Sequence, residues 1–166
     1  MDNNGHSSSE ISATTPDWSR EAVTAFWQPS RQLLKTIRGY QRHRNRRGVL
    51  SQLARRRYAL EHRFWSVVTG ADIPLTCQIG GGLMMPHPNG IVIHPDAIIG
   101  VNCLLFQQVT LGTRRGGGVP ILEGHVDVGA GAKVVGTVII PAHSEVAANA
   151  VVTSWPPKAR GLAQRP

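Results

Sequence analysis

Residues 122–152 read LEGHVDVGAGAKVVGTVIIPAHSEVAANAVV, and every sixth residue of this stretch is aliphatic. The repeating positions are Leu122, Val128, Val134, Ile140, Val146 and Val152. A period of six fits neither an amphipathic helix nor a half-buried strand, whose side chains repeat about every 3.6 and 2 residues. It is the period of a hexapeptide β-helix, in which each repeat supplies one short strand and one corner. The stretch therefore predicts stacked parallel strands with these aliphatic side chains inside.

The same six-residue series of aliphatic positions, which we call the aliphatic ladder, extends upstream. A small or compact residue follows most of its members four positions later. The upstream members are Ile73, Ile79, Met85, Ile93, Ile99, Leu105 and Leu111. The small or compact residues are Ala97, Cys103, Val109, Val126, Ala132, Val138, Ser144 and Ala150. We therefore predict a mainly β fold, with a β-helix domain over residues 71–154 and one continuous core.

The register of the ladder breaks twice. The step from Met85 to Ile93 is eight residues, and the step from Leu111 to Leu122 is eleven. Insertions in a solenoid form loops, which often gather on its binding face. The first insertion carries His87 between two prolines, and the second is rich in glycine and arginine. These two loops are where the sequence predicts chemistry.

The 166 residues suit one domain with an accessory piece, and no run of about 18 apolar residues predicts a membrane span. We expect a disordered tail over residues 1–14, an α-helical region over 15–70 and a C-terminal tail over 155–166. The only cysteines, Cys77 and Cys103, favour a reduced, cytoplasmic setting.

Three helices are expected between residues 15 and 69. The first would start at Pro16, and the last would end at a C-cap glycine, Gly70. The apolar stripe of the third helix comprises Leu53, Leu60, Phe64 and Val67. Such a stripe normally faces the protein core.

Six segments resemble a known family. They are Asp72-Ile73-Pro74, Ile79 to Gly82, His87 to Ile93, Val109 to Gly112, Val128 to Lys133, and Val152 to Pro157. Their order, with a histidine in the first insertion, is similar to that of the serine O-acetyltransferases among the hexapeptide-repeat acyltransferases. The resemblance implies a left-handed β-helix of triangular section, a homotrimer, and acetyl-CoA as a co-substrate lying between adjacent prisms, with no permanently bound cofactor and no metal.

The resemblance also implies roles for individual residues. The family's catalytic histidine matches His87, and the aspartate that orients it matches Asp72. Coenzyme-binding positions match Gly112, Thr113, Ala130 and Lys133. The chemistry is reasonable, because acetyl transfer from a thioester to a hydroxyl needs a base near neutrality, which histidine provides. A carboxylate beside its ring would fix the tautomer and stabilise the imidazolium.

Two departures from the family pattern leave the acceptor open. Pro86 stands where an aspartate usually precedes the catalytic histidine, and Val119 stands where a histidine usually precedes a proline. Both polar groups are expected to hold serine, so L-serine in cysteine biosynthesis is the first hypothesis and a sugar, polysaccharide or other small alcohol is the second. Neither the choice between trimer and hexamer nor an association with the next enzyme of cysteine synthesis follows from the sequence.

Residues 31–63 hold eleven basic residues and one acid, Glu61. Nucleic-acid binding is one interpretation of this charge. Without a recognised nucleic-acid module, a solvated face or a surface toward a neighbouring subunit is favoured, and no membrane partner is expected. A zinc hydratase using His87, His94, His125 or His143 is a further alternative that the spacing does not favour.

Overall fold

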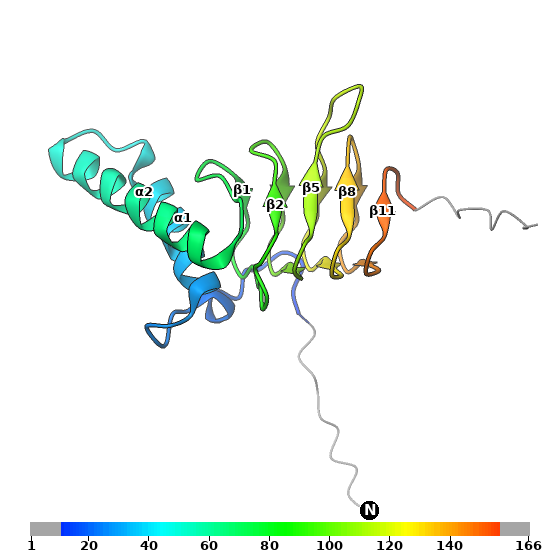
Figure 1. Ribbon diagram of the computed structural model, residues 1–166, viewed down its shortest axis with the longest axis horizontal. Helices are drawn as coiled ribbons and strands as arrows, with labels where there is room; N and C mark the ends of the chain where they lie inside the picture. The colour runs from blue at the N-terminus through cyan, green and yellow to red at the C-terminus, as the bar shows by residue number, and fades with distance from the viewer. Residues whose placement is uncertain (1–10, 157–166) are drawn as a thin grey trace, which may run out of the picture.

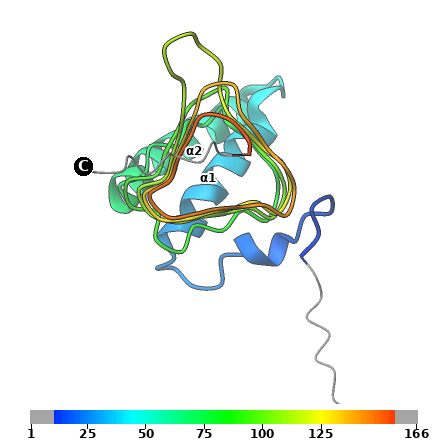
Figure 2. The ribbon, with the colours of Figure 1, turned by 90° about the vertical axis from the view of Figure 1, so that its right-hand side faces the viewer.

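The computed structural model describes residues 11–156, so residues 1–10 and 157–166 of the two expected tails lie outside the described residues. A helical hairpin leads into a β-helix (Figure 1). Viewed along its axis, the β-helix has a triangular section (Figure 2). The fold is a left-handed parallel β-helix after a helical region, as predicted.

Short strands form the three faces of the prism. The strands are β1 (Gln78–Ile79), β2 (Val92–Ile93), β3 (Ile98–Ile99), β4 (Leu104–Leu105), β5 (Thr110–Gly112), β6 (Ile121–Leu122), β7 (Asp127–Val128), β8 (Lys133–Val135), β9 (Ile139–Ile140), β10 (Glu145–Val146) and β11 (Val151–Val152). They stack as the sheets β1-β3-β6-β9, β10-β7-β4 and β11-β8-β5-β2, all with parallel pairing. Each sheet therefore joins strands from successive coils.

The aliphatic ladder forms the core of the prism. All of its predicted members are buried, and Ile79, the most exposed of them, retains 8% of its accessible surface. The compact positions from Ala97 to Val138 are buried too, whereas Ser144 and Ala150 are partly exposed in the last coils. The predicted period and register are thus confirmed.

Glycine follows the ladder residue where successive coils approach most closely. A Cβ atom on Gly100 would lie 2.5 Å from the carbonyl carbon of Glu123 on the next coil. A Cβ atom on Gly80 would likewise lie 2.6 Å from the carbonyl carbon of Gly100. Only glycine fits these positions without moving the backbone of the neighbouring coil.

Two helices cap the N-terminal end of the prism. Helix α1 (Pro29–Arg44) begins with proline in its first turn, where no N–H is required, and buries Leu33, Leu34 and Ile37 in the core. Helix α2 (Val49–Thr69) packs against α1, and it ends at Gly70 in the left-handed conformation, with φ 64°. The predicted C-cap is confirmed.

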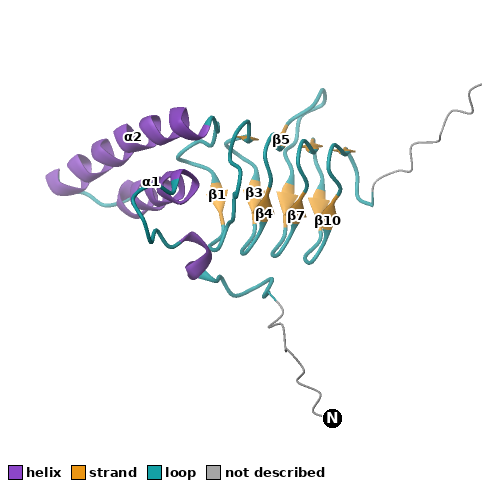
Figure 3. Ribbon diagram, turned by 60° about the horizontal axis from the view of Figure 1, so that its bottom comes forward, coloured by secondary structure: helices purple, strands orange, loops and turns teal. Residues whose placement is uncertain are grey.

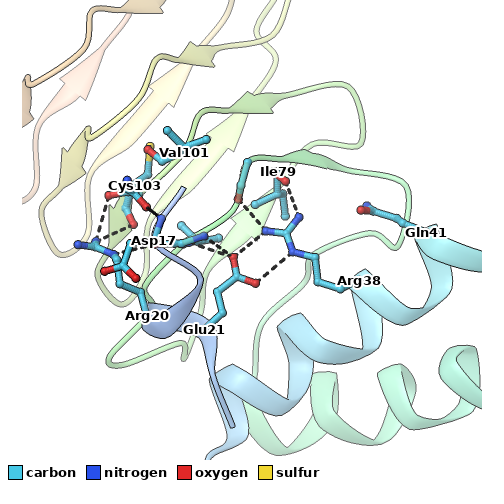
Figure 4. A network of polar contacts seen from close by, with 12 residues as sticks. Asp17, Arg20, Glu21, Arg38, Gln41, Ile79, Val101 and Cys103 are labelled. Carbon is cyan, nitrogen blue, oxygen red and sulfur yellow. Dashed lines mark hydrogen bonds and ion pairs between the residues drawn. The ribbon is translucent and has the colours of Figure 1, made fainter. Parts of the chain in front are cut away.

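The predicted first helix is wrong. Only the 3₁₀ turn η1 (Trp18–Glu21) forms there, capped by the side chain of Asp17. The turn is fixed by contacts distant in sequence. Arg20 Nε donates to the carbonyl of Gly82 at 2.8 Å, and the buried carboxylate of Glu21 accepts from the backbone N–H of Gly82 at 2.8 Å (Figure 4). These contacts with the prism outweigh local helix propensity.

The expectation of a disordered tail over residues 1–14 is not met at residues 11–14. The side-chain amide of Asn102 donates to the carbonyls of Ser12 at 2.7 Å and Thr15 at 2.8 Å, and its oxygen accepts from the backbone N–H of Asp17 at 2.7 Å. Asn102 is a corner residue with φ 57°. One buried amide therefore holds this segment against the prism.

The apolar stripe of α2 does not face the core. Leu53, Leu60, Phe64 and Val67 are each more than half exposed. Instead, Trp65 and Thr69 are buried on the other side of the helix. Within residues 11–156, neither helix is both long enough and apolar enough to cross a bilayer.

Candidate functional site

His87 lies in the first insertion, on the loop that enters β2. Backbone hydrogen bonds fix this loop between two coils: Gly90 N–H donates to the carbonyl of Gly70 at 2.8 Å, and Gln108 N–H donates to that of Asn89 at 2.9 Å. The imidazole itself is exposed, and no hydrogen bond joins it to any residue of the described range 11–156. The loop therefore presents an accessible ring on an ordered backbone.

Asp72 lies one coil below the end of this loop. Its N–H donates to the carbonyl of Ile91 at 2.8 Å, and its carbonyl accepts from Ile93 N–H at 2.9 Å. This bridge pairs Asp72 with Val92, as the stacking of coils predicts. The carboxylate is exposed and makes no hydrogen bond to His87 among the described residues, so the backbone juxtaposition is present without a side-chain contact.

An outward-facing column continues from Asp72 along the sheet β11-β8-β5-β2. In successive coils it contains Asp72, Val92, Thr110, Lys133 and Val151. Lys133 Nζ donates to the carbonyl of Gln108, at the corner where that face begins. The column places Lys133 three coils from Asp72, on the same face.

Ala130 shares the entry edge of this face with the His87 loop. Its carbonyl accepts from Asn149 N–H at 2.8 Å, and the next residue, Gly131, donates to the carbonyl of Gln107 at 2.8 Å. Ala130 and Lys133 therefore belong to the edge at which strands β2, β5 and β8 begin. Sequence reasoning missed Gln107, Gln108 and Thr110, although counting one coil forward from the His87 loop and two coils forward from Asp72 would have found them.

Gly112 and Thr113 lie at the opposite edge, where β5 ends and the second insertion begins (Figure 1). Gly112 accepts from Gly136 N–H at 2.9 Å, and the loop turns through a bond from Gly117 N–H to the carbonyl of Arg114 at 2.9 Å. The side chain of Arg114 lies over Gly136, because a Cβ atom on Gly136 would be 2.9 Å from Cδ of Arg114. Because β2 and β5 are parallel neighbours, the two insertions leave opposite ends of one face.

A pocket of about 310 Å³ borders the His87 loop at Pro86. Its lining includes Arg20, Arg31, Met84 and Met85, and none of its described lining residues is acidic. Arg20 is partly engaged by backbone carbonyls, and Arg31 donates to the carbonyl of Ala22 at 2.7 Å. The pocket is therefore electropositive and partly apolar, a feature the sequence did not reveal.

The two cysteines are not candidates for a nucleophile. Both are free and buried in the core. Burial, followed by the charges of Asp72 and Asp96, raises the pKa of Cys77 to about 12. Burial likewise raises the pKa of Cys103 to about 11. Both thiols are protonated near neutrality, whereas the thiolate is the reactive form.

The histidines considered for zinc do not converge. In the part of the chain that the structure describes, no three His, Cys, Asp or Glu side chains gather closely enough to hold a metal. His125 and His143 do meet, with their Nδ1 atoms 2.8 Å apart on adjacent coils of one corner. His94 lies elsewhere and contacts Asp96.

Comparison with known proteins finds similarity to serine acetyltransferases. The chain is 38% identical over 109 residues to that of Helicobacter pylori strain 26695, covering 64% of this chain and 57% of the relative. It is 39% identical over 89 residues to that of Synechococcus elongatus, covering 52% of this chain and 36% of the relative. The chain thus spans about half the length, or less, of these relatives. No family model matches the sequence.

Solved structures give the same result. A serine acetyltransferase in complex with CoA superposes with a TM-score of 0.64 at 26% identity, over 78% of this chain and 52% of the other. The serine acetyltransferase of Neisseria gonorrhoeae superposes with a TM-score of 0.58 at 29% identity, over 76% of this chain and 46% of the other. Both likenesses extend beyond the six matched segments to most of the described chain.

Proposed function

We propose that the chain transfers an acetyl group from acetyl-CoA to the hydroxyl of L-serine, because it is similar to a serine acetyltransferase over 64% of its sequence and shares the fold of another. His87 is the general base. The observation that carries this proposal is an accessible imidazole on a fixed loop, with Asp72 one coil beneath it. The product, O-acetylserine, would feed cysteine synthesis, and two free cysteines support a reducing cytoplasmic setting.

The reaction needs one group that accepts a proton and then returns it. The imidazole of His87 takes the hydroxyl proton as the oxygen attacks the thioester carbonyl. The C–S bond then breaks, and the imidazolium returns the proton to the departing CoA sulfur. A general base of this kind contributes roughly 10²–10⁴-fold to the rate. Asp72 would hold the other ring nitrogen and stabilise the imidazolium once the site closes around the substrates.

A homotrimer would complete the site. The two insertions lie at opposite ends of one prism face, and five to six extended residues span roughly 17–20 Å. That separation is too long for His87 and Thr113 of one chain to contact the same thioester. A neighbouring prism could bring its own second insertion to the entry edge, with CoA lying between the two chains. Lys133 and Ala130 would then line one wall of the groove, and Gly112 and Thr113 the other.

A direct test measures CoA release with L-serine as acceptor. We expect His87→Ala to lower kcat by at least about a hundredfold. His143→Asn is the matched control, because His143 is an exposed corner residue with φ 59° and asparagine tolerates that conformation. Equal activity of both variants and wild type would show that His87 is not the base. No release from any hydroxyl acceptor would overturn the acetyl-transfer proposal itself.

One observation favours a second acceptor class, a sugar or another alcohol without an ammonium group. The pocket beside Pro86 contains Arg20 and Arg31 and no acidic residue among its described lining, so serine's ammonium group would find no carboxylate there. Val119 likewise offers no polar contact to the amino-acid head group. A panel of L-serine, neutral sugars and sugar acids, each at matched concentration, distinguishes the two by kcat/KM.

A further inference from the structure

Helix α2 carries an apolar stripe on its outer surface that the described residues leave exposed. Its members recur at spacings of three, four and seven residues, which place them on one helix face. They are Val49 (72% exposed), Leu53 (54%), Leu60 (65%), Phe64 (55%) and Val67 (84%). We call this set the α2 outer stripe. Several exposed apolar side chains on one helix face mark an interaction site more often than an isolated exposed leucine does.

Exposed aromatic rings also lie near the C-terminal end of α2, around Trp65. Phe26 and Trp27 are 76% and 65% exposed. Their ring centroids lie 6.3 and 5.9 Å from that of Trp65, and the ring of Phe64 lies 5.0 Å from it. Trp65 itself is buried, so it anchors these exposed rings to the fold. The apolar surface therefore combines aliphatic and aromatic groups.

Arginines border the same face. Arg56 and Arg63 are exposed and follow Leu53 and Leu60 by three residues. Glu61 is the single acid among residues 31–63, and Arg57 already engages it at 2.7 Å. The surface is thus apolar along its centre and strongly positive at its margin, which requires a partner that is both apolar and anionic.

Within residues 11–156, no other part of the structure covers this face. Trp65 and Thr69, on the opposite side of α2, are the residues buried against the fold. Figure 3 shows α2 outside α1 and beyond the end of the β-helix. The stripe therefore points away from the prism and from both insertions.

A second copy of the chain does not fit the stripe. A symmetric contact would bring the arginines of both copies together with no free acid from residues 31–63 to compensate them. A coiled-coil seam also needs apolar residues at two positions of each heptad. With Leu53, Leu60 and Val67 at one position, the other holds Leu50, Arg57 and Phe64, so a seam here would place Arg57 against its own copy.

We propose that α2 is a peripheral membrane anchor that lies in the headgroup region of an anionic lipid bilayer. An interfacial helix of this type buries an apolar face by about 5–10 Å while basic side chains meet lipid phosphates. The 21 residues of α2 form a convex rod about 30 Å long, which suits a surface and not a groove. Nucleic acid fits less well, because its protein interfaces are more polar than this stripe. The proposal does not depend on acetyl transfer.

The test is co-sedimentation of the full chain with vesicles. One set contains phosphatidylcholine alone, and the other contains phosphatidylcholine mixed with phosphatidylglycerol. We expect binding to the anionic vesicles, weak binding to the neutral ones, and partial release at high salt, because screening weakens only the charged contribution. Equal binding to both vesicle types, or to neither, overturns the proposal.

Paired variants separate the two contributions. Arg56→Gln with Arg63→Gln should lower partitioning onto anionic vesicles about 25-fold, since each arginine near such a surface contributes roughly fivefold. Leu60→Gln with Val67→Gln should lower it at least about tenfold. The matched controls are Lys35→Gln with Arg42→Gln on α1, and Ile139→Gln on the prism, where exposure is 54%. Controls should stay within about threefold of wild type.

Two further readouts complete the test. Circular dichroism must show an unchanged fold for each variant, which is expected because every altered side chain is exposed. Light scattering without vesicles measures self-association. If the protein self-associates and Leu60→Gln with Val67→Gln abolishes this, the occupant is a second copy and the membrane proposal is wrong. Salt-sensitive RNA binding without vesicle binding would contradict it equally.

Discussion

Glu21 and Arg38 form an ion pair of 2.7 Å in which the side chains are 8% and 19% exposed (Figure 4). The same carboxylate accepts from the backbone N–H groups of Gly82 and Leu83 at 2.8 and 3.1 Å, and the same guanidinium donates to the carbonyl of Gly80 at 2.6 Å. The pair thus joins η1 and α1 to the first coil of the prism. Glu21, which the sequence does not single out, therefore connects all three elements.

Removing Glu21 should destabilise the protein far more than removing a surface acid. Glu21→Ala leaves Arg38 and two backbone N–H groups buried without their partner, a loss of roughly 3–5 kcal/mol in the free energy of unfolding. Glu61→Ala breaks the Arg57 pair, whose side chains are 73% and 33% exposed, and should cost less than about 1 kcal/mol. Urea unfolding of both variants measures the difference. Equal losses would mean that the pair does not anchor the helices.

Asp72→Asn should lower kcat while leaving the fold intact. The exposed carboxylate carries no hydrogen bond that the fold needs among the described residues, so stability should change little. If it orients His87 in the working enzyme, its loss should cost at least tenfold and up to about 10⁴-fold in kcat. Asp96→Asn is the control, because Asp96 is an exposed acid in the turn between β2 and β3. Similar kcat values for both variants would contradict the proposed role of Asp72.

Gly100→Ala should be destabilising, whereas Gly112→Ala should not. The new methyl group at position 100 would lie 2.5 Å from the backbone of Glu123, so two coils must separate. Overpacking of this kind typically costs about 1–3 kcal/mol. At Gly112 the nearest atoms are 3.6 and 3.9 Å away, which is ordinary van der Waals contact. Urea midpoints at constant m-value provide the comparison.

The sequence predicts the β-helix well because a solenoid repeats one local rule. Each ladder residue, such as Leu111 or Val134, faces inward for the same reason as the one before it. Counting coils also predicts that Asp72 stacks beneath β2, since stacking follows from the period alone. The period does not determine how exposed side chains such as those of Asp72 and His87 point, so it could not predict whether the two side chains make contact.

The helical region was harder to predict, because its contacts are not periodic. Residues 15–28 have a helix-like start, yet Arg20 and Glu21 bind backbone groups more than sixty positions away, which no local pattern reveals. In α2 the sequence offers two apolar faces. Trp65 packs inward and Val67 points to solvent, and amphipathicity alone cannot distinguish the side that meets α1.

The buried thiols should make stability fall at alkaline pH. Burial raises the pKa of Cys77 to about 12 and that of Cys103 to about 11, above the ordinary value of 9.0. Between pH 9 and 11 the unfolded chain has therefore lost protons that the folded chain keeps, so the free energy of unfolding decreases as pH rises. Below pH 9 both states hold these protons and the effect vanishes. Each thiol can contribute up to about 1.4 kcal/mol per pH unit.

Urea unfolding at pH 7.5 and pH 10 measures this loss, and the double variant Cys77→Ala with Cys103→Ala isolates the thiols from lysine and tyrosine. The variant should be less stable at neutral pH, because two core side chains are truncated. Its decline between the two pH values should nevertheless be smaller than that of wild type. Iodoacetamide should label neither thiol of the folded protein at pH 8 and both after unfolding. A decline of equal size in both proteins, or rapid labelling of the native state, would show that the thiols are not held protonated by burial.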